Sequence, residues 1–167
     1  MRRVWSPWRS KYIETFKKSP KGKRKGASVF TAALKANDDD KHLIVWRGEH
    51  CFVIMNLYPY NSGHLMIVPN RPTTSLQDLT LVELAEVMQT VQRAVRALDA
   101  VMHPQGYNFG ANIGQVSGAG VEDHVHFHLV PRWNGDTNFM PVLADTKVIS
   151  EDMRSTLVKL RKAFRKV

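Results

Sequence analysis

Three histidines at alternating positions are the most informative feature of this 167-residue sequence. His124, His126 and His128 alternate with apolar residues. Because successive side chains of a β-strand point to opposite faces, a strand here puts the three imidazoles on one face, roughly 7 Å apart for each two-residue step. The apolar residues between them then face the core. Packing explains such a face poorly, since a buried imidazole needs partners for both ring nitrogens.

Two kinds of chemistry fit a histidine face. One is a metal site, because imidazole is a common zinc ligand. The other is nucleophilic catalysis by one imidazole that its neighbours orient. A glycine-rich loop, residues 114–120, lies just upstream, and the backbone N–H groups of such a loop can cradle a phosphate. A phosphate site beside a nucleophile favours the catalytic interpretation, and a metal-binding module remains the alternative.

The pattern resembles the histidine triad superfamily of nucleotide hydrolases and transferases. Residues 124–130 have the order His-φ-His-φ-His-φ-φ, where φ is an apolar residue. Upstream, Asn56 and residues 63–69 resemble the asparagine and the Gly-His strand of the family. The tryptophan-containing residues 5–9 and the segment 131–139 look like the bacterial branch akin to diadenosine tetraphosphate hydrolases and phosphorylases.

This resemblance implies a role for each of four histidines. His126 attacks the α-phosphorus of a dinucleoside polyphosphate and forms a covalent nucleotidyl-histidine. Water, or inorganic phosphate in a phosphorylase, then releases the nucleotide. His128 helps the leaving group to depart, and His124 and His64 orient the nucleophile.

The resemblance also implies residues that bind the substrate. Asn56 contacts the ribose, and Asn112 holds the phosphates together with the backbone of the glycine-rich loop. The loop residues concerned are Ser117, Gly118, Ala119 and Gly120. The length of the phosphate chain and the choice between water and phosphate as acceptor stay open.

The sequence departs from the family at the positions that bind zinc. Many members carry a Cys-x-x-Cys pair in the first helix and a later histidine, which bind structural zinc together with the first histidine of the triad. The corresponding residues here are Ser28, Thr31 and Pro72. Hydroxyls are poor zinc ligands, so we predict no structural zinc and no other bound cofactor. Whether a divalent cation accompanies the polyphosphate substrate stays open.

The elements that position these residues predict an α+β, HIT-like fold, with a mainly antiparallel sheet, one long helix and one or two shorter ones. Thr80 and Glu83 form a capping box that opens the long helix. Its expected apolar face consists of Leu81, Leu84, Met88, Val91, Val95, Leu98 and Met102. Shorter helices are expected over residues 29–34 and from Ser150 toward Phe164. Strands are expected over residues 43–46, 51–55, 64–68, 107–113 and 124–130.

Charge is distributed unevenly along the chain. The 24 basic and 15 acidic residues give a net charge of +9. Residues 1–26 carry ten basic side chains and one acidic side chain, whereas residues 27–158 carry 9 basic and 14 acidic ones. We therefore divide the chain into a basic arm and linker (1–26), a catalytic domain (27–158) and a basic helix end (159–167). Nucleic-acid binding through the basic ends is a further alternative, which the acidic body does not favour.

Cysteine content and hydropathy indicate the compartment. The single cysteine, Cys51, excludes a disulfide framework and suits a reducing cytoplasm. The longest apolar runs are too short to span a membrane, and the N-terminus lacks an apolar signal segment. We therefore expect a cytoplasmic protein that has no membrane partner. Because histidine triad proteins are commonly two-fold dimers, the resemblance also implies a homodimer.

Overall fold

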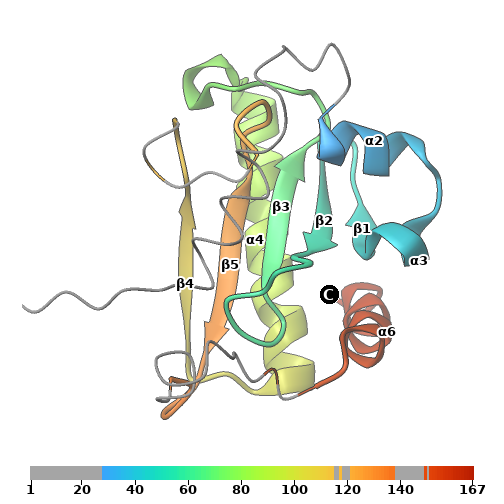
Figure 1. The fold of residues 1–167 in the computed structure, drawn as a ribbon, viewed down its shortest axis with the longest axis vertical. Helices are drawn as coiled ribbons and strands as arrows, with labels where there is room; N and C mark the ends of the chain where they lie inside the picture. Colours follow the sequence, from blue (N-terminus) through green and yellow to red (C-terminus); the bar gives the residue numbers. More distant parts are fainter. Residues whose placement is uncertain (1–27, 115–116, 118–120, 138–148, 150) are drawn as a thin grey trace, which may run out of the picture.

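The computed structural model describes residues 28–114, 117, 121–137, 149 and 151–167 (Figure 1). The predicted basic arm, residues 1–26, lies outside the described residues, as do Gly118, Ala119, Gly120 and Ser150. The helical segments described are α2 (Val29–Lys35), α3 (Asp39–His42), the 3-10 helix η1 (Leu76–Asp78), α4 (Leu81–Met102) and α6 (Met153–Phe164). The strands described are β1 (Ile44–Arg47), β2 (Cys51–Met55), β3 (Leu65–Pro69), β4 (Gly106–Ala111) and β5 (Phe127–Arg132).

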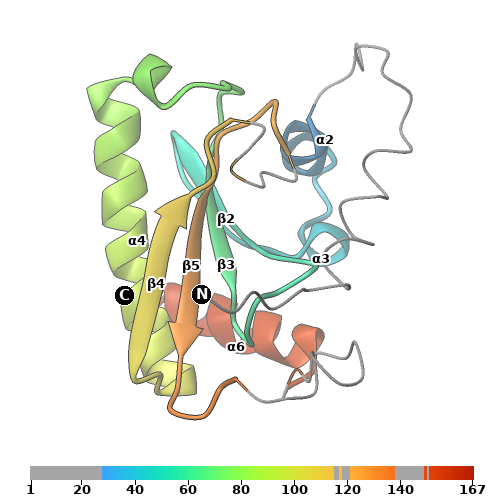
Figure 2. The ribbon, with the colours of Figure 1, turned by 60° about the vertical axis from the view of Figure 1, so that its left-hand side comes forward.

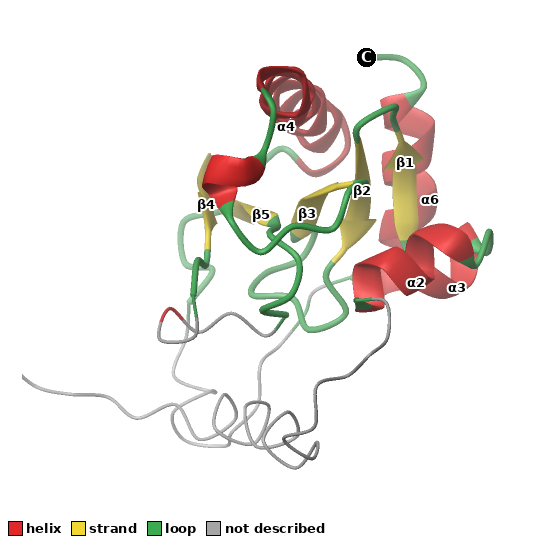
Figure 3. Cartoon of the chain, turned by 90° about the horizontal axis from the view of Figure 1, so that it is seen from above, coloured by secondary structure: helices red, strands yellow, loops and turns green. Residues whose placement is uncertain are grey.

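The strands form one antiparallel sheet in the order β1-β2-β3-β5-β4. This order inserts β5 between β3 and β4, so that segments far apart in sequence become neighbours. His128 of β5 lies opposite Met66 of β3 on one side and opposite Gly110 of β4 on the other. Helix α4 covers one face of the sheet, and α2 lies on the opposite side (Figures 2 and 3). The predicted α+β class with an antiparallel sheet is confirmed.

The core lies mainly between the sheet and α4. Val125, Phe127 and Leu129 are buried there with residues of α4 and α6, which confirms that the residues between the histidines face the core. A smaller apolar cluster on the opposite face joins Phe30 of α2 to Phe52 of β2. The histidine segment therefore separates the main core from the side of the sheet that carries α2.

The regular pairing of β5 begins later than the sequence predicts. His124 and His126 precede the first ladder residue, Phe127, so the predicted strand over residues 124–130 is wrong at its start. The N–H of Val125 donates instead to the carbonyl oxygen of Thr73, at 2.7 Å. The loop after β3, rather than a neighbouring strand, thus holds the chain at this point, and the alternation of side chains continues through it.

Helix α4 begins with the predicted capping box. The Thr80 hydroxyl accepts from the N–H of Glu83, and the Glu83 carboxylate accepts from the N–H of Thr80. The predicted apolar face is only partly right, because Leu81 and Met88 are exposed. The buried face instead includes Val87 and Ala94.

The small side chain of Ala94 explains why the sequence pattern did not reveal this part of the buried face of α4. The buried residues Val87, Val91, Ala94 and Leu98 follow the three- and four-residue spacing of a helix that packs on one side. An alanine in this row has too little apolar surface to signal burial in a sequence pattern.

The last helix, α6, packs on α4 and β1. It begins after Asp152, whose carboxylate accepts from the N–H of Ser155 at 2.9 Å, so the predicted start of this helix at Ser150 is wrong. Leu157, Leu160 and Phe164 are buried. No helix within the described ranges is long and apolar enough to cross a membrane.

Candidate active site

The pairing of β3 with β5 brings four histidines together. His64 directly precedes β3, and its Nε2 lies 2.9 Å from Nδ1 of His128. The ring centroids of His126 and His128 are 4.9 Å apart. His64, His124 and His126 are each almost completely buried, and His128 is half-buried. The structure thus brings the rings of His64, His126 and His128 together, and His124 lies in the same segment, two residues before His126.

The protonation of His126 follows from a hydrogen bond to the backbone. Its Nδ1 lies 2.9 Å from the carbonyl oxygen of His124. Because a carbonyl oxygen can only accept, Nδ1 carries the proton and Nε2 is left with its lone pair. Burial lowers the pKa of His126 below its ordinary value, and the hydrogen bond to the carbonyl opposes this effect in part. His126 is therefore a neutral imidazole whose Nε2 can act as a nucleophile.

A second chain of hydrogen bonds sets the proton on His128. The backbone N–H of Tyr60 donates to Nδ1 of His64 at 3.1 Å. His64 consequently carries its proton on Nε2 and donates it to Nδ1 of His128. The proton of a neutral His128 must then lie on its Nε2, which makes that atom a donor.

Aromatic packing holds the same two rings. The Tyr60 ring lies 4.7 Å from the ring of His64 and stacks on His128 at 5.8 Å, centroid to centroid. The ring of Tyr60 and its backbone N–H thus both support histidines.

His124 is held by hydrogen bonds on both nitrogens. Its Nε2–H donates to the carbonyl oxygen of Pro69 at 2.8 Å, so its Nδ1 accepts from the Ser28 hydroxyl, also at 2.8 Å. Burial is the main reason why the pKa of His124 is lowered. Ser28 is the N-cap of α2, and Phe30 of the same helix packs against the rings of both His124 and His126. His124 thus links α2 to the histidine segment.

The residues at the zinc positions of the family are engaged with one another. The hydroxyls of Ser28 and Thr31 lie 3.3 Å apart, and Ser28 bonds His124. This donor set consists of two hydroxyls and an imidazole whose two nitrogens are both used, which is a poor set for zinc. Among the described residues, no group of three or more His, Cys, Asp or Glu side chains is arranged to hold a metal ion.

The predicted substrate-binding residues lie around this cluster, with local hydrogen bonds of their own. The Asn56 Oδ1 accepts from the N–H of Tyr58 at 2.9 Å, and its Nδ2 lies 3.4 Å from Nδ1 of His64. Asn112 directly follows β4, whose last pair joins Ala111 to Phe127. Asn112 therefore lies where the chain leaves the sheet, next to the histidine segment of residues 124–128.

Part of the predicted phosphate loop can be described. The Ser117 hydroxyl donates to the carbonyl oxygen of Gly114 at 2.6 Å, which closes a local turn. Gly114 has a φ of +81°, a conformation that side chains other than glycine rarely adopt. The roles given to Gly118, Ala119 and Gly120 fall on residues outside the described ranges.

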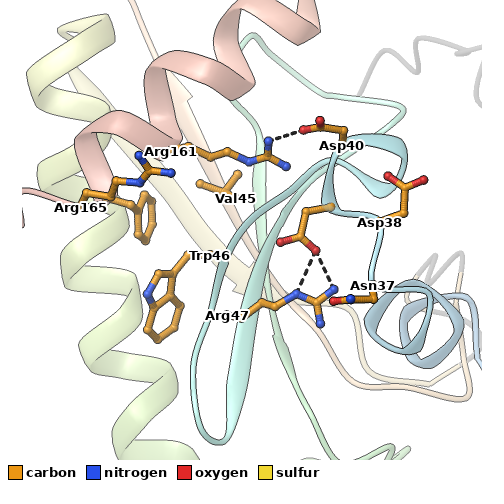
Figure 4. A pocket seen from close by; sticks show the side chains of 10 residues that line it. Asn37, Asp38, Asp40, Val45, Trp46, Arg47, Arg161 and Arg165 are labelled. Carbon is orange, nitrogen blue, oxygen red and sulfur yellow. Dashed lines mark hydrogen bonds and ion pairs between the residues drawn. The ribbon is translucent and has the colours of Figure 1, made fainter.

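A cavity far from the histidines lies between α3, β1 and α6 (Figure 4). Its volume is about 730 Å³, and its lining includes Trp46 and several charged side chains. Arg47 pairs with Asp39 at 2.6 Å, and Arg161 pairs with Asp40. Because these arginines already have anionic partners and no histidine lines the cavity, it is a poor candidate for the nucleotide chemistry.

Sequence reasoning missed the residues that hold the histidines through long-range contacts. Ser28 was noted only as a weak zinc ligand, although its hydroxyl bonds an imidazole 96 positions away. The backbone groups of Pro69 and Tyr60 carry no signal at all, because every residue type but proline has the same N–H and all have the same carbonyl. The preference of serine for N-cap positions is the one signal by which the sequence could have identified Ser28.

Three comparisons agree with this geometry. The HIT domain family model matches residues 37–135. An AP-4-A phosphorylase from Mycobacterium tuberculosis is 40% identical over 158 residues, which cover 93% of this chain and 80% of the relative. A bis(5'-nucleosyl)-tetraphosphatase (asymmetrical) from Schizosaccharomyces pombe is 30% identical over 93 residues, or 56% of this chain and 50% of the relative. A zinc-bound histidine triad family protein from Mycobacterium smegmatis superimposes with a TM-score of 0.68 at 26% identity, covering 84% of this chain and 94% of that structure.

Proposed function

Because this chain belongs to the HIT domain family, we propose that it is an enzyme that cleaves dinucleoside polyphosphates through a covalent intermediate on His126. The observation that carries the proposal is the protonation of His126, whose Nδ1–H is engaged by the carbonyl of His124 while Nε2 keeps its lone pair. The relative named AP-4-A phosphorylase, which matches 93% of this chain, supports the substrate class.

The first step is the transfer of a nucleotidyl group to His126. Nε2 attacks the α-phosphorus in line, a P–N bond forms, and the bridging P–O bond breaks. The departing oxygen accepts a hydrogen bond from the Nε2–H of His128, the donor that the hydrogen bond from His64 leaves in that position, and this bond stabilises the negative charge that develops on the leaving group. The protein supplies orientation and charge stabilisation, with Asn56, Asn112 and the amides of residues 117–120 as the groups that bind ribose and phosphates.

The second step transfers the nucleotidyl group to an acceptor. The acceptor attacks the same phosphorus, a P–O bond forms, the P–N bond breaks, and His126 returns to a neutral imidazole, while the proton that a water acceptor loses passes to solvent. Water as acceptor releases AMP from a diadenosine substrate, whereas inorganic phosphate releases ADP. The phosphorylase relative covers far more of this chain than the hydrolase relatives do, so we propose phosphate as the preferred acceptor.

The products of diadenosine tetraphosphate distinguish these outcomes. Purified protein is incubated with the substrate with and without inorganic phosphate, and the nucleotides are separated. ATP and ADP with phosphate, or ATP and AMP without it, are the expected pairs. His126→Ala is expected to abolish both, whereas His50→Ala, in the turn between β1 and β2, serves as a matched control. Equal product from wild type and His126→Ala would refute the catalytic role.

We also propose a cytoplasmic homodimer without structural zinc. The single cysteine supports the compartment, the family resemblance supports the dimer, and the hydroxyl set of Ser28 and Thr31 supports the lack of zinc. Light scattering of the full chain and of a chain without residues 1–16 tests the dimer. Elemental analysis tests for zinc or copper, and a chelator in the cleavage assay tests for a divalent cation. Removal of residues 1–26 tests whether any nucleic-acid binding is separate from cleavage.

A further inference from the structure

The carboxylate of Asp136 is nearly buried and lies just after the end of β5. The side chain of Asp136 is only 7% exposed. Its two oxygens accept from Arg132, with Nε at 2.5 Å and Nη2 at 2.8 Å, and one of them also accepts from the N–H of Trp133 at 3.1 Å. These contacts, the arginine first, lower the pKa of Asp136 to about 2. The group is therefore a fixed anion at any pH at which the enzyme works.

Asn61 connects this anion to the loop that precedes the first histidine. Its Nδ2 donates to Asp136 at 2.8 Å and to the carbonyl oxygen of Pro131 at 3.1 Å. Its own backbone carbonyl accepts from the N–H of His64 at 3.2 Å. Figure 1 shows the loop between β2 and β3 at the same end of the sheet as the end of β5. The Asn61 side chain thus holds the middle of the loop between β2 and β3 against the turn after β5.

The loop held by Asn61 carries the donors that set the protonation of His64, because Nδ2 of Asn56, at the start of the loop, also lies 3.4 Å from Nδ1 of His64. The N–H of Tyr60, one residue before Asn61, donates to Nδ1 of His64. If the loop shifts by roughly 1 Å, this hydrogen bond weakens, and the proton of His64 is no longer restricted to Nε2. His128 would then no longer be obliged to keep its own proton on Nε2.

We propose that Asn61 and Asp136 are positioning residues that, by holding the loop of residues 56–63, keep the proton of His128 on Nε2, where it donates a hydrogen bond to the leaving group. This inference rests on the proposed function. The two residues do not touch the reacting atoms. They act through the Tyr60 amide and His64, and their loss should therefore affect the departure of the leaving group more than the binding of the nucleotide.

Leaving groups of different basicity separate this role from a merely structural one. The phenyl ester of AMP has a basic leaving group whose departure depends strongly on a hydrogen bond from His128, whereas the 4-nitrophenyl ester has a much less basic one. For Asn61→Ala we expect kcat to fall roughly 100-fold with the phenyl ester, as for a misplacement of about 1 Å, and less than about tenfold with the nitrophenyl ester. KM should change little for either.

Two further variants complete the test. Asp136→Asn keeps the shape and removes the charge, and it should give the same selective loss in milder form. Gln105→Ala removes a different hydrogen bond to the same turn, from the N–H of Asn134 to Gln105 Oε1 at 2.6 Å, and should leave both esters unaffected. Equal losses on the two esters, or none, in Asn61→Ala would overturn the inference.

Nitrogen-15 NMR of the imidazoles tests the same inference without turnover. In the wild type, Nδ1 of His64 should have the chemical shift of an unprotonated nitrogen, and in Asn61→Ala this shift should move toward the protonated value. An unchanged shift would contradict the positioning role even if the variant were less active. A wild type that cleaves neither ester nor diadenosine tetraphosphate would instead contradict the proposed function.

Discussion

Replacement of Ser28 by alanine tests how the histidine segment is anchored to α2. The Ser28 hydroxyl makes two hydrogen bonds that alanine cannot make. It donates to Nδ1 of His124 at 2.8 Å, and it accepts from the N–H of Thr31 at 3.2 Å as the N-cap of the helix. Ser28 and His124 are both buried, so water does not readily replace the lost hydroxyl.

The expected cost is the sum of these two losses. An N-cap serine contributes about 1 kcal/mol, and a buried polar atom left without its hydrogen bond costs about 1–3 kcal/mol. Ser28→Ala should therefore lower the free energy of unfolding by about 2–4 kcal/mol. For a chain of this length, such a loss corresponds to a fall in Tm of roughly 5–15 °C.

Urea and thermal denaturation measure this loss, and Thr80→Ala provides the control. Thr80 caps α4 through the N–H of Glu83 at 3.2 Å and bonds no histidine, so its replacement should cost only about 1 kcal/mol. If Ser28→Ala costs no more than Thr80→Ala, the bond to His124 contributes nothing measurable, and the reasoning about this anchor is wrong.

Three other predictions concern stability and reactivity. Burial lowers the pKa of His124 and His126 below 6.5, so the unfolded chain binds more protons than the folded chain just below that pH. The free energy of unfolding, measured in urea, should therefore decrease as the pH is lowered from about 7.5 to about 5.5. A constant free energy of unfolding would contradict this prediction. Gly63→Ala should cost about 1–3 kcal/mol because its φ is +74° and a Cβ would lie 2.6 Å from Met102 Sδ, whereas Gly110→Ala, where no described atom lies within 4 Å, should change stability little. Burial raises the pKa of Cys51 to about 12, so Ellman's reagent should modify it only after denaturation; rapid reaction of the native protein would argue against this burial.

Much of the fold could be predicted because its signals are local. The capping box at Thr80 and the alternation around His126 each depend on residues a few positions apart, and both are present in the structure. The start of β5 could not be predicted in the same way. Its position depends on the hydrogen bond between Val125 and Thr73, and local sequence carries no information about a backbone contact across 52 positions.

The candidate site, like the fold, could be predicted only in part from the sequence. The sequence identified the four histidines by type and spacing, and the structure brings the rings of His64, His126 and His128 together, while the backbone carbonyl of His124 accepts from His126. The contacts that decide where each proton lies come partly from distant segments, through the Ser28 hydroxyl and the Pro69 carbonyl. The other two are backbone groups close in sequence, the carbonyl of His124 and the N–H of Tyr60, which no residue type reveals. The phosphate loop remains a prediction for Gly118, Ala119 and Gly120, and so does each substrate contact of Asn56 and Asn112.

The most direct test of the central claim is to trap the covalent intermediate. The protein is mixed with diadenosine tetraphosphate, quenched in alkali, in which a P–N bond to histidine survives, and digested for mass spectrometry. We predict that the peptide containing His126 gains the mass of one adenylyl group and that added phosphate converts this group to ADP. Turnover without any adduct, or an adduct that persists in His126→Ala, would contradict the claim that His126 is the nucleophile.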